Sequence, residues 1–195
     1  MSGTFPTSPA FNSLNISSEQ KTITSTTDSG KMFATQVDGQ RWKLTASFPP
    51  MTRADFMPIY AFIIKQRSQK ETFSIIPPVV SNARGTETGT VLVNGSHSAG
   101  DTTINIDGMN GTFKAGEFIK FSGSKVYMIV EDASADSNGE ATITIEPPLR
   151  SALSDNETVT YDSVPFTVRL QNDVQDFNTG IDGLYRFEID VIEAL

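Results

Sequence analysis

The chain contains no cysteine, which excludes disulfide bonds, zinc–thiolate sites and thiol catalysis. It also has no apolar run approaching the roughly 18 to 20 residues that a membrane helix needs. The opening residues, MSGTFPTSPAFNS, contain neither the basic region nor the apolar stretch of a secretory signal. We therefore expect a protein that is synthesised in the cytoplasm and does not bind a membrane.

Positive charge is scarce, with 15 Lys and Arg residues against 23 Asp and Glu and a formal net charge of −8. A nucleic-acid surface needs clustered Lys and Arg to meet the phosphates, so the composition argues against nucleic-acid binding. The sequence has no GxxxxGK[ST] phosphate loop. The glycines at 108–111 open no helical pattern, so we expect no dinucleotide site.

Histidine occurs only once, at His97, in the loop-like stretch 94–98. A Ser-His-Asp arrangement is formally available, because serines and carboxylates abound in the chain. We nevertheless interpret His97 as a solvated loop residue.

Carboxylates are the remaining candidates for acid–base or glycosidic chemistry. The candidates are Glu131, Asp132, Asp136, Asp173, Asp176 and Asp182. Most lie in turn-like hydrophilic stretches, and nothing in the sequence brings a pair together, so we interpret them as solvated charges.

The stretch DSNGE at 136–140 places oxygen ligands around a glycine, as calcium loops do. The same Asn-Gly pair between alternating strands is a strong hairpin signal, which is the interpretation that we prefer. We therefore predict no catalytic, cofactor-binding or metal-binding residue and no enzyme activity.

The most informative segment is 39–73, which predicts a strand, a capped helix and a second strand. Every second residue from Trp42 to Phe48 is apolar, as in a half-buried strand. Thr52 offers an N-cap hydroxyl, with Asp55 three residues on as its partner. One apolar stripe follows at helical spacing, formed by Phe56, Ile59, Tyr60, Ile63 and Ile64. We predict one helix at about residues 53–67, packed on a sheet.

Glycine is concentrated in the middle of the chain, where nine of the 14 glycines lie between Gly85 and Gly139. Short alternating segments separated by tight turns occur there, which predicts a small β-barrel or sandwich. These segments are 103–106, 117–121, 126–130, 142–145 and 158–161.

The flanking segments carry longer alternating strands, the last of them at 184–192. We predict a mainly β chain, with a barrel or sandwich and one helix. A discontinuous host domain, 11–81 and 163–195, is interrupted by a small β domain at 82–162. Residues 1–10, rich in Ser, Thr and Pro, are predicted to form a flexible arm.

The aromatic side chains allow two interpretations, because they are typical both of carbohydrate grooves and of protein cores. The residues in question are Trp42, Phe48, Phe62, Phe73, Phe166, Tyr185 and Phe187. Their regular placement favours the core. We expect Trp42, Phe56, Ile63 and Phe187 to be central to it.

The flanking segments resemble a family of tail proteins of long-tailed phages. The motifs that carry the resemblance are RW-x-L-x-x-x-F at 41–48, MTR-x-x-F-MPIYAFI at 51–63, QR-x-Q at 66–69, F-x-I-x-PP at 73–78 and LYRFEIDVIEAL at 184–195. The chain looks like the minor tail or tail-tip proteins, in the class of the lambda M protein and the distal tail proteins. The insert, with AG-x-F-I-x-F at 115–121, looks like accessory β modules of related phage proteins, although the short tail-tip members lack so large an insert.

The resemblance implies a virion structural protein of the tail tip or baseplate, located in the phage tail. It implies a homo-oligomeric ring, commonly a hexamer, that joins the tail tube to the distal hub, with other tail proteins as partners and no enzyme activity or cofactor. We expect the terminal strand and the N-terminal arm to make the contacts between copies, because exposed sheet edges invite pairing.

Two other functions stay open at this point. In the first, the insert at 82–162 is a binding module that contacts host glycan or neighbouring tail proteins. In the second, the chain is a carboxylate-dependent hydrolase acting on cell walls.

Overall fold

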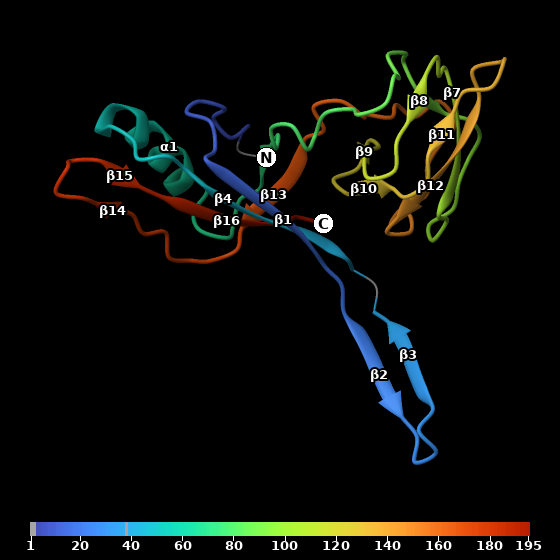
Figure 1. Cartoon of the computed structure of the whole chain (residues 1–195), viewed down its shortest axis with the longest axis horizontal. Coiled ribbons are helices and arrows are strands. Elements are labelled where there is room, and N and C mark those ends of the chain that lie inside the picture. The colour runs from blue at the N-terminus through green and yellow to red at the C-terminus, as the bar shows by residue number, and fades with distance from the viewer. Residues whose placement is uncertain (1–2, 38) are drawn as a thin grey trace. The chain divides into compact units, whose positions relative to one another are not determined.

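The computed structural model describes residues 3–37 and 39–195, and Figure 1 draws their elements. This part of the chain is mainly β, with antiparallel sheets and one helix, which confirms the predicted fold class. The described residues divide into two compact units. The first contains 6–72 and 168–194, and the second contains 73–167 with residues 3–5 and Leu195. One unit therefore interrupts the other along the chain.

The main sheet of the first unit is built around a strand with alternating burial. The strand order is β1-β4-β16-β13, with bounds β1 Ser13–Glu19, β4 Arg41–Ser47, β16 Glu188–Glu193 and β13 Phe166–Leu170. On β4, Trp42, Leu44 and Ala46 are buried, while the residues between them are more exposed. The period-2 pattern of this strand is confirmed.

The helix α1, Arg53–Lys65, begins where the sequence predicts it and ends two residues earlier. Thr52 is its N-cap, and the hydroxyl of Thr52 accepts a hydrogen bond from the amide of Asp55. The buried stripe consists of Phe56, Ile59 and Ile63. The assignment of Ile64 to this stripe was wrong, because its side chain is 55% exposed.

The predicted strand at 184–192 is interrupted at Phe187, leaving β15 (Tyr185–Arg186) separate from β16. Tyr185 exchanges two backbone hydrogen bonds of 2.9 Å with Met51, and β15 also pairs with β14 (Asn178–Thr179). Beyond the break, β16 pairs with β4. The strand therefore changes partners at Phe187, which the alternation of side chains does not reveal.

The second unit contains a sheet of order β6-β7-β12-β10-β9 and a separate pair, β8 and β11. The strands of this unit are β5 Phe73–Ile75, β6 Leu92–Val93, β7 Thr103–Asp107, β8 Thr112–Phe113, β9 Phe118–Lys120, β10 Val126–Ile129, β11 Ala133–Ser134 and β12 Ala141–Glu146. The predicted strand at 158–161 does not form. Thr158 and Thr160 make only isolated bridges, to Leu92 and Lys120 respectively.

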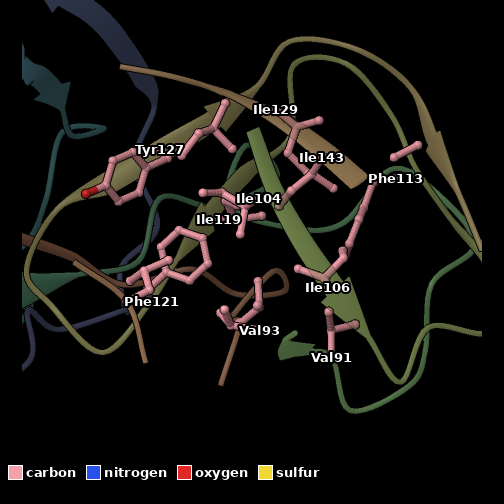
Figure 2. Close-up of a cluster of buried hydrophobic side chains, with 14 of the residues drawn as sticks. Val91, Val93, Ile104, Ile106, Phe113, Ile119, Phe121, Tyr127, Ile129 and Ile143 are labelled. Carbon is pink, nitrogen blue, oxygen red and sulfur yellow. The ribbon is translucent and has the colours of Figure 1, made fainter. Parts of the chain in front are cut away.

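The core of the second unit is a cluster of aliphatic and aromatic side chains from these strands, drawn in Figure 2. Ile104, Ile129 and Ile143 are fully buried in it. The rings of Phe121 and Tyr127 lie 5.5 Å apart, centroid to centroid, at its edge. Burial in this core accounts for the alternating apolar residues of the insert without any catalytic or binding role for them.

Residues 3–5 are fixed to the second unit by backbone pairing. The amide of Phe5 donates to the carbonyl of Ser74 at 2.7 Å, and the amide of Ser74 donates to the carbonyl of Gly3 at 3.0 Å. Phe5 is 3% exposed and lies 6.1 Å from the ring of Phe73. The flexibility predicted for residues 1–10 therefore does not extend to 3–5, because burial of an aromatic side chain holds them.

Candidate interaction surface

The two segments expected to join copies of the chain are already used inside it. The terminal strand β16 lies between β4 and β13, so both of its edges are paired, and Ala194 is 4% exposed. Phe5 of the N-terminal arm is buried. Both edges of β16 are therefore occupied within the chain, so other exposed segments come into consideration for contacts between copies.

The hairpin formed by β2 (Thr22–Thr26) and β3 (Met32–Gln36) exposes every residue of both strands. Figure 1 shows it in light blue as a two-stranded ribbon that continues from β1 and β4. Isolated two-stranded hairpins are marginally stable in water, since they bury too little apolar surface. An exposed ribbon of this kind is typical of a segment that becomes covered by a partner.

The turn of this hairpin is closed by hydrogen bonds around Thr27. Its amide donates to the carbonyl of Lys31 at 3.0 Å, and its hydroxyl accepts from the amide of Lys31 at 3.2 Å. The amide of Gly30, which has a φ of +82°, donates to the carbonyl of Thr27 at 2.8 Å. Glycine suits this left-handed position because it has no Cβ. The sequence thus defines the turn locally, without help from other elements.

Both faces of the hairpin expose large apolar side chains that no other described residue covers. Ile23 pairs with Thr35, and Ser25 pairs with Phe33, so these four side chains share a face. Ile23 is 64% and Phe33 51% exposed. Met32, on the opposite face, is 66% exposed. Large apolar side chains exposed on a short ribbon make it a candidate interaction surface.

The hairpin also differs in charge from the rest of the chain. Lys21 and Lys31 outweigh Asp28, so the hairpin is slightly positive in a chain with a net charge of −8. The ammonium of Lys31 lies 5.0 Å from the centroid of the Phe33 ring. The tip therefore presents an aromatic ring and a positive charge side by side.

A groove of about 370 Å³ lies elsewhere in the first unit. It is lined by Ser47, Phe48, Pro50, Asp176, Phe177, Asn178, Arg186, Phe187 and Glu188. Three of these residues are phenylalanines, and Asp176 and Glu188 are exposed carboxylates. Neither carboxylate forms an ion pair with any residue that the structure describes. Arg186 is engaged, since its guanidinium lies 2.8 Å from the carboxylate of Asp182.

Aromatic contacts hold the groove in shape. Phe48 and Phe187 stack with centroids 6.0 Å apart, and Phe56 of α1 contacts both Phe177, at 5.0 Å, and Phe187, at 5.7 Å. Tyr60 packs edge-on against Phe177 at 5.0 Å. Helix α1 thus positions the floor of the groove, which gives the helix an architectural role.

Two interpretations were open for seven aromatic residues, a carbohydrate groove or the protein core, and most of these residues are buried. Trp42, Phe48 and Phe187 are between 5% and 7% exposed, and Phe73 and Phe166 are 0% exposed. Phe62 and Tyr185 are partly buried. Phe56 and Ile63 are both 0% exposed, which confirms the four expected core residues.

His97 is largely buried, with 11% of its side chain exposed, and not solvated as expected. Its Nε2 accepts a hydrogen bond from the amide of Asn105 at 3.2 Å, and its Nδ1 lies 3.9 Å from the carboxylate of Asp101. No serine hydroxyl bonds to this ring in the described part of the chain. The Ser-His-Asp arrangement is therefore not assembled, because Nε2 is occupied by a backbone amide.

The six candidate carboxylates are all exposed, and none of the three pockets described for residues 3–37 and 39–195 is lined by two of them. The Lys114 ammonium, 2.7 Å away, and the amide of Ala115 lower the pKa of Asp132. The Arg186 guanidinium and the amide of Leu184 lower the pKa of Asp182. Lowered values keep a carboxylate ionised, which is the opposite of what a general acid at neutral pH needs.

Asp136 closes the turn that the sequence places at Asn138-Gly139. One carboxylate oxygen accepts from the amides of Asn138, at 2.8 Å, and Glu140, at 2.9 Å. These hydrogen bonds, first that of Glu140, lower the pKa of Asp136. Among the described residues no group of three or more His, Asp or Glu side chains is arranged to hold a metal ion.

Glu87 and Glu117 are among the buried carboxylates that the sequence analysis did not single out. Glu87, 5% exposed, accepts hydrogen bonds from the amides of Gly89, Asn110 and Gly111, and so ties two loops together. Glu117, 1% exposed, accepts from the amides of Arg84 and Gly85 through one oxygen. Glu87 stands among Thr and Gly residues, and Glu117 follows Gly116 at the start of the predicted segment 117–121, so neither position carries a pattern typical of a buried carboxylate.

A pocket of about 330 Å³ in the second unit is a candidate glycan site, because aromatic and charged side chains line it. It lies against Phe121, Tyr127 and Glu157, with Lys125 and Arg150 also lining it. Phe121 and Tyr127 are each 4% exposed. Their rings therefore present no open face on which a sugar could stack.

No protein-family model matches the chain, and no curated protein matches it at a significant level. Within the residues that the structure covers, no helix is long and apolar enough to cross a membrane.

Proposed function

We propose that this chain is a virion structural protein of a phage tail tip or baseplate, which assembles as a ring and joins the tail tube to the distal hub. The observation that carries the proposal is the hairpin β2–β3, whose ten strand residues are all exposed while its Ile23, Met32 and Phe33 are apolar. The family resemblance of the flanking segments supplies the identity of the assembly.

Energetics favour covering the hairpin in an assembly. Burying a Phe, Ile or Met side chain fully stabilises a complex by roughly 1.5–3 kcal/mol per residue. Three such side chains are more than half exposed on one short ribbon. Association costs several kcal/mol in lost freedom, so a ring that buries the same ribbon at every interface is a reasonable way to exceed that cost.

The absence of an assembled catalytic set among the described residues supports a structural role over a hydrolase. The exposed carboxylates with lowered pKa and the backbone-bound His97 are not arranged for acid–base work. The closed faces of Phe121 and Tyr127 give the glycan-binding alternative no specific support.

The test is the mass of the purified full-length chain by light scattering, with negative-stain imaging, compared with a variant that lacks the hairpin. In the variant, an Asn-Gly turn replaces residues 21–37, since β1 and β4 are paired up to Glu19 and Arg41. We expect rings, commonly hexamers, from the natural chain and monomers from the variant. Circular dichroism and Trp42 fluorescence should show that the variant remains folded.

A natural chain that stays monomeric at its highest soluble concentration would overturn the ring proposal. A folded variant that assembles as well as the natural chain would show that the hairpin does not carry assembly. Rings that bind the end of purified tail tubes would support the joining role, and rings that bind only host polysaccharide would contradict it.

A further inference from the structure

We propose that the tip of hairpin β2–β3 docks in the groove of a second copy of this chain, with Phe33 against the exposed ring of Phe177. This inference rests on the proposed function and names the contact through which the ring forms. It assigns a partner to two surfaces that the isolated chain leaves open.

The hairpin and the groove lie at opposite ends of one strand. The hairpin precedes β4 in the chain, and Ser47 and Phe48 of the groove follow at the other end of that strand. The seven residues of β4 span about 23 Å, at about 3.3 Å per residue. The hairpin leaves its own groove unfilled, since Phe33 is 51% exposed. A second copy is therefore the occupant that these positions favour.

The hairpin at one end of β4 and the groove at the other end would form a head-to-tail contact between copies. Such a contact uses two different surfaces, so each copy offers one of each to its neighbours. Repetition of a head-to-tail contact closes into a ring when the rotation per copy divides a full turn. The placement of the two surfaces thus agrees with the assembly that the proposed function requires.

The chemistry of the two surfaces is complementary. The hairpin tip offers the ring of Phe33 with the ammonium of Lys31 5.0 Å from its centroid. The groove offers the exposed ring of Phe177 together with the exposed carboxylates of Asp176 and Glu188. In the docked state, the Phe33 ring meets the Phe177 ring and the Lys31 ammonium meets a carboxylate, so the contact leaves no charge buried without a partner.

The size of the groove suits an aromatic side chain. Its volume of about 370 Å³ falls at the lower end of the ~300–1,000 Å³ range of small-molecule sites. Phe177 on its wall is itself 37% exposed, so the groove leaves part of an aromatic face open to solvent. A second aromatic ring is the side chain that covers such a face most effectively.

Because the natural chain has no cysteine, a disulfide between copies can be tested with two introduced residues. The test variant is the full chain with Ser25→Cys, which pairs with Phe33 and shares its face, and Asn178→Cys, on the groove wall. Oxidation should give a ladder of covalent oligomers, because each copy carries both partners of the contact. The matched control joins Ser25→Cys with Gln69→Cys, an exposed loop residue that does not line the groove.

A charge exchange provides a second readout that does not depend on crosslinking. Lys31→Glu and Glu188→Lys should each raise the dissociation constant of the assembly by about two- to five-fold, the effect of losing an exposed ion pair. The double variant should recover most of the loss. Phe33→Ala should weaken assembly by about ten-fold or more, whereas Thr24→Ala on the other face should leave it unchanged.

The outcomes separate this inference from the proposed function. If rings form but the specific disulfide ladder does not, the docking contact is overturned while the ring proposal stands. The same conclusion follows if the double charge variant loses as much affinity as the two single variants combined. A natural chain that never assembles would overturn both. A ladder with Asn178→Cys and none with Gln69→Cys would establish the contact.

Discussion

Glu157 is a residue whose ionisation bears on the stability of the second unit. Its carboxylate accepts from the amide of Ser122 at 2.9 Å, from the hydroxyl of Ser122, and from the amide of Ser154 at 3.3 Å. Burial raises its pKa, but these hydrogen bonds outweigh burial and lower the pKa below the ordinary value of 4.5. A lowered pKa in the folded state means that the stabilisation is present above about pH 4.5 and is lost as the pH falls further.

Glu157→Gln should therefore destabilise the chain by about 1 kcal/mol at pH 7, and by clearly less at pH 3, where the natural carboxylate is itself being protonated. Urea unfolding followed by circular dichroism at both pH values measures the difference. Glu146→Gln, at an exposed position of β12, is the control. A loss of stability that is the same at both pH values would show that the charge is not responsible.

Residue-scale features were the hardest to predict from the sequence. The burial of Glu87 and Glu117 depends on amides from loops distant along the chain, which no local pattern reports. His97 was expected in solvent because its neighbours are small and polar, yet the pairing of its backbone with Leu153 places its ring against the amide of Asn105. Tertiary contacts decide these environments.

Helix α1 depends on its N-cap in a way that can be measured. The hydroxyl of Thr52 accepts from the amide of Asp55 and donates to its carboxylate at 2.7 Å. Thr52→Ala should lower the free energy of unfolding of the first unit by about 1 kcal/mol, the usual cost of losing such a cap. Urea unfolding followed by fluorescence of Trp42, the only tryptophan, reports on this unit. An unchanged midpoint, matching that of Thr24→Ala, would argue against the cap.

Elements with one buried face were predictable, and elements without one were not. Helix α1 and strand β4 show period 3.6 and period 2, because each packs one face on a core. The hairpin β2–β3 is exposed on both faces and rich in Thr and Ser, so it shows no contrast between faces and was missed. Its detectable signal was the run TITSTT, β-branched except at Ser25, followed by Asp-Ser-Gly, which favours a strand and a turn.

At the scale of the whole molecule, net charge should govern how readily copies associate. Each copy carries −8, so approaching copies repel each other, and added salt screens that repulsion. We expect the dissociation constant to fall several-fold between low salt and about 0.15 M NaCl, where the Debye length is about 8 Å. Analytical ultracentrifugation at both salt concentrations measures this. Lys31→Glu adds negative charge to each copy, so the dissociation constant of this variant should depend more steeply on salt. Assembly that weakens as salt is added would contradict the expectation.

The position of the hairpin before β4 and of the groove after it gives each copy a direction. A growing arc of copies would then have one end that shows a groove and another that shows a hairpin. A folded copy without the hairpin keeps its groove, so it caps the hairpin end of an arc and accepts no further neighbour there. Small amounts of such a copy would act as a chain terminator and leave open arcs in place of closed rings.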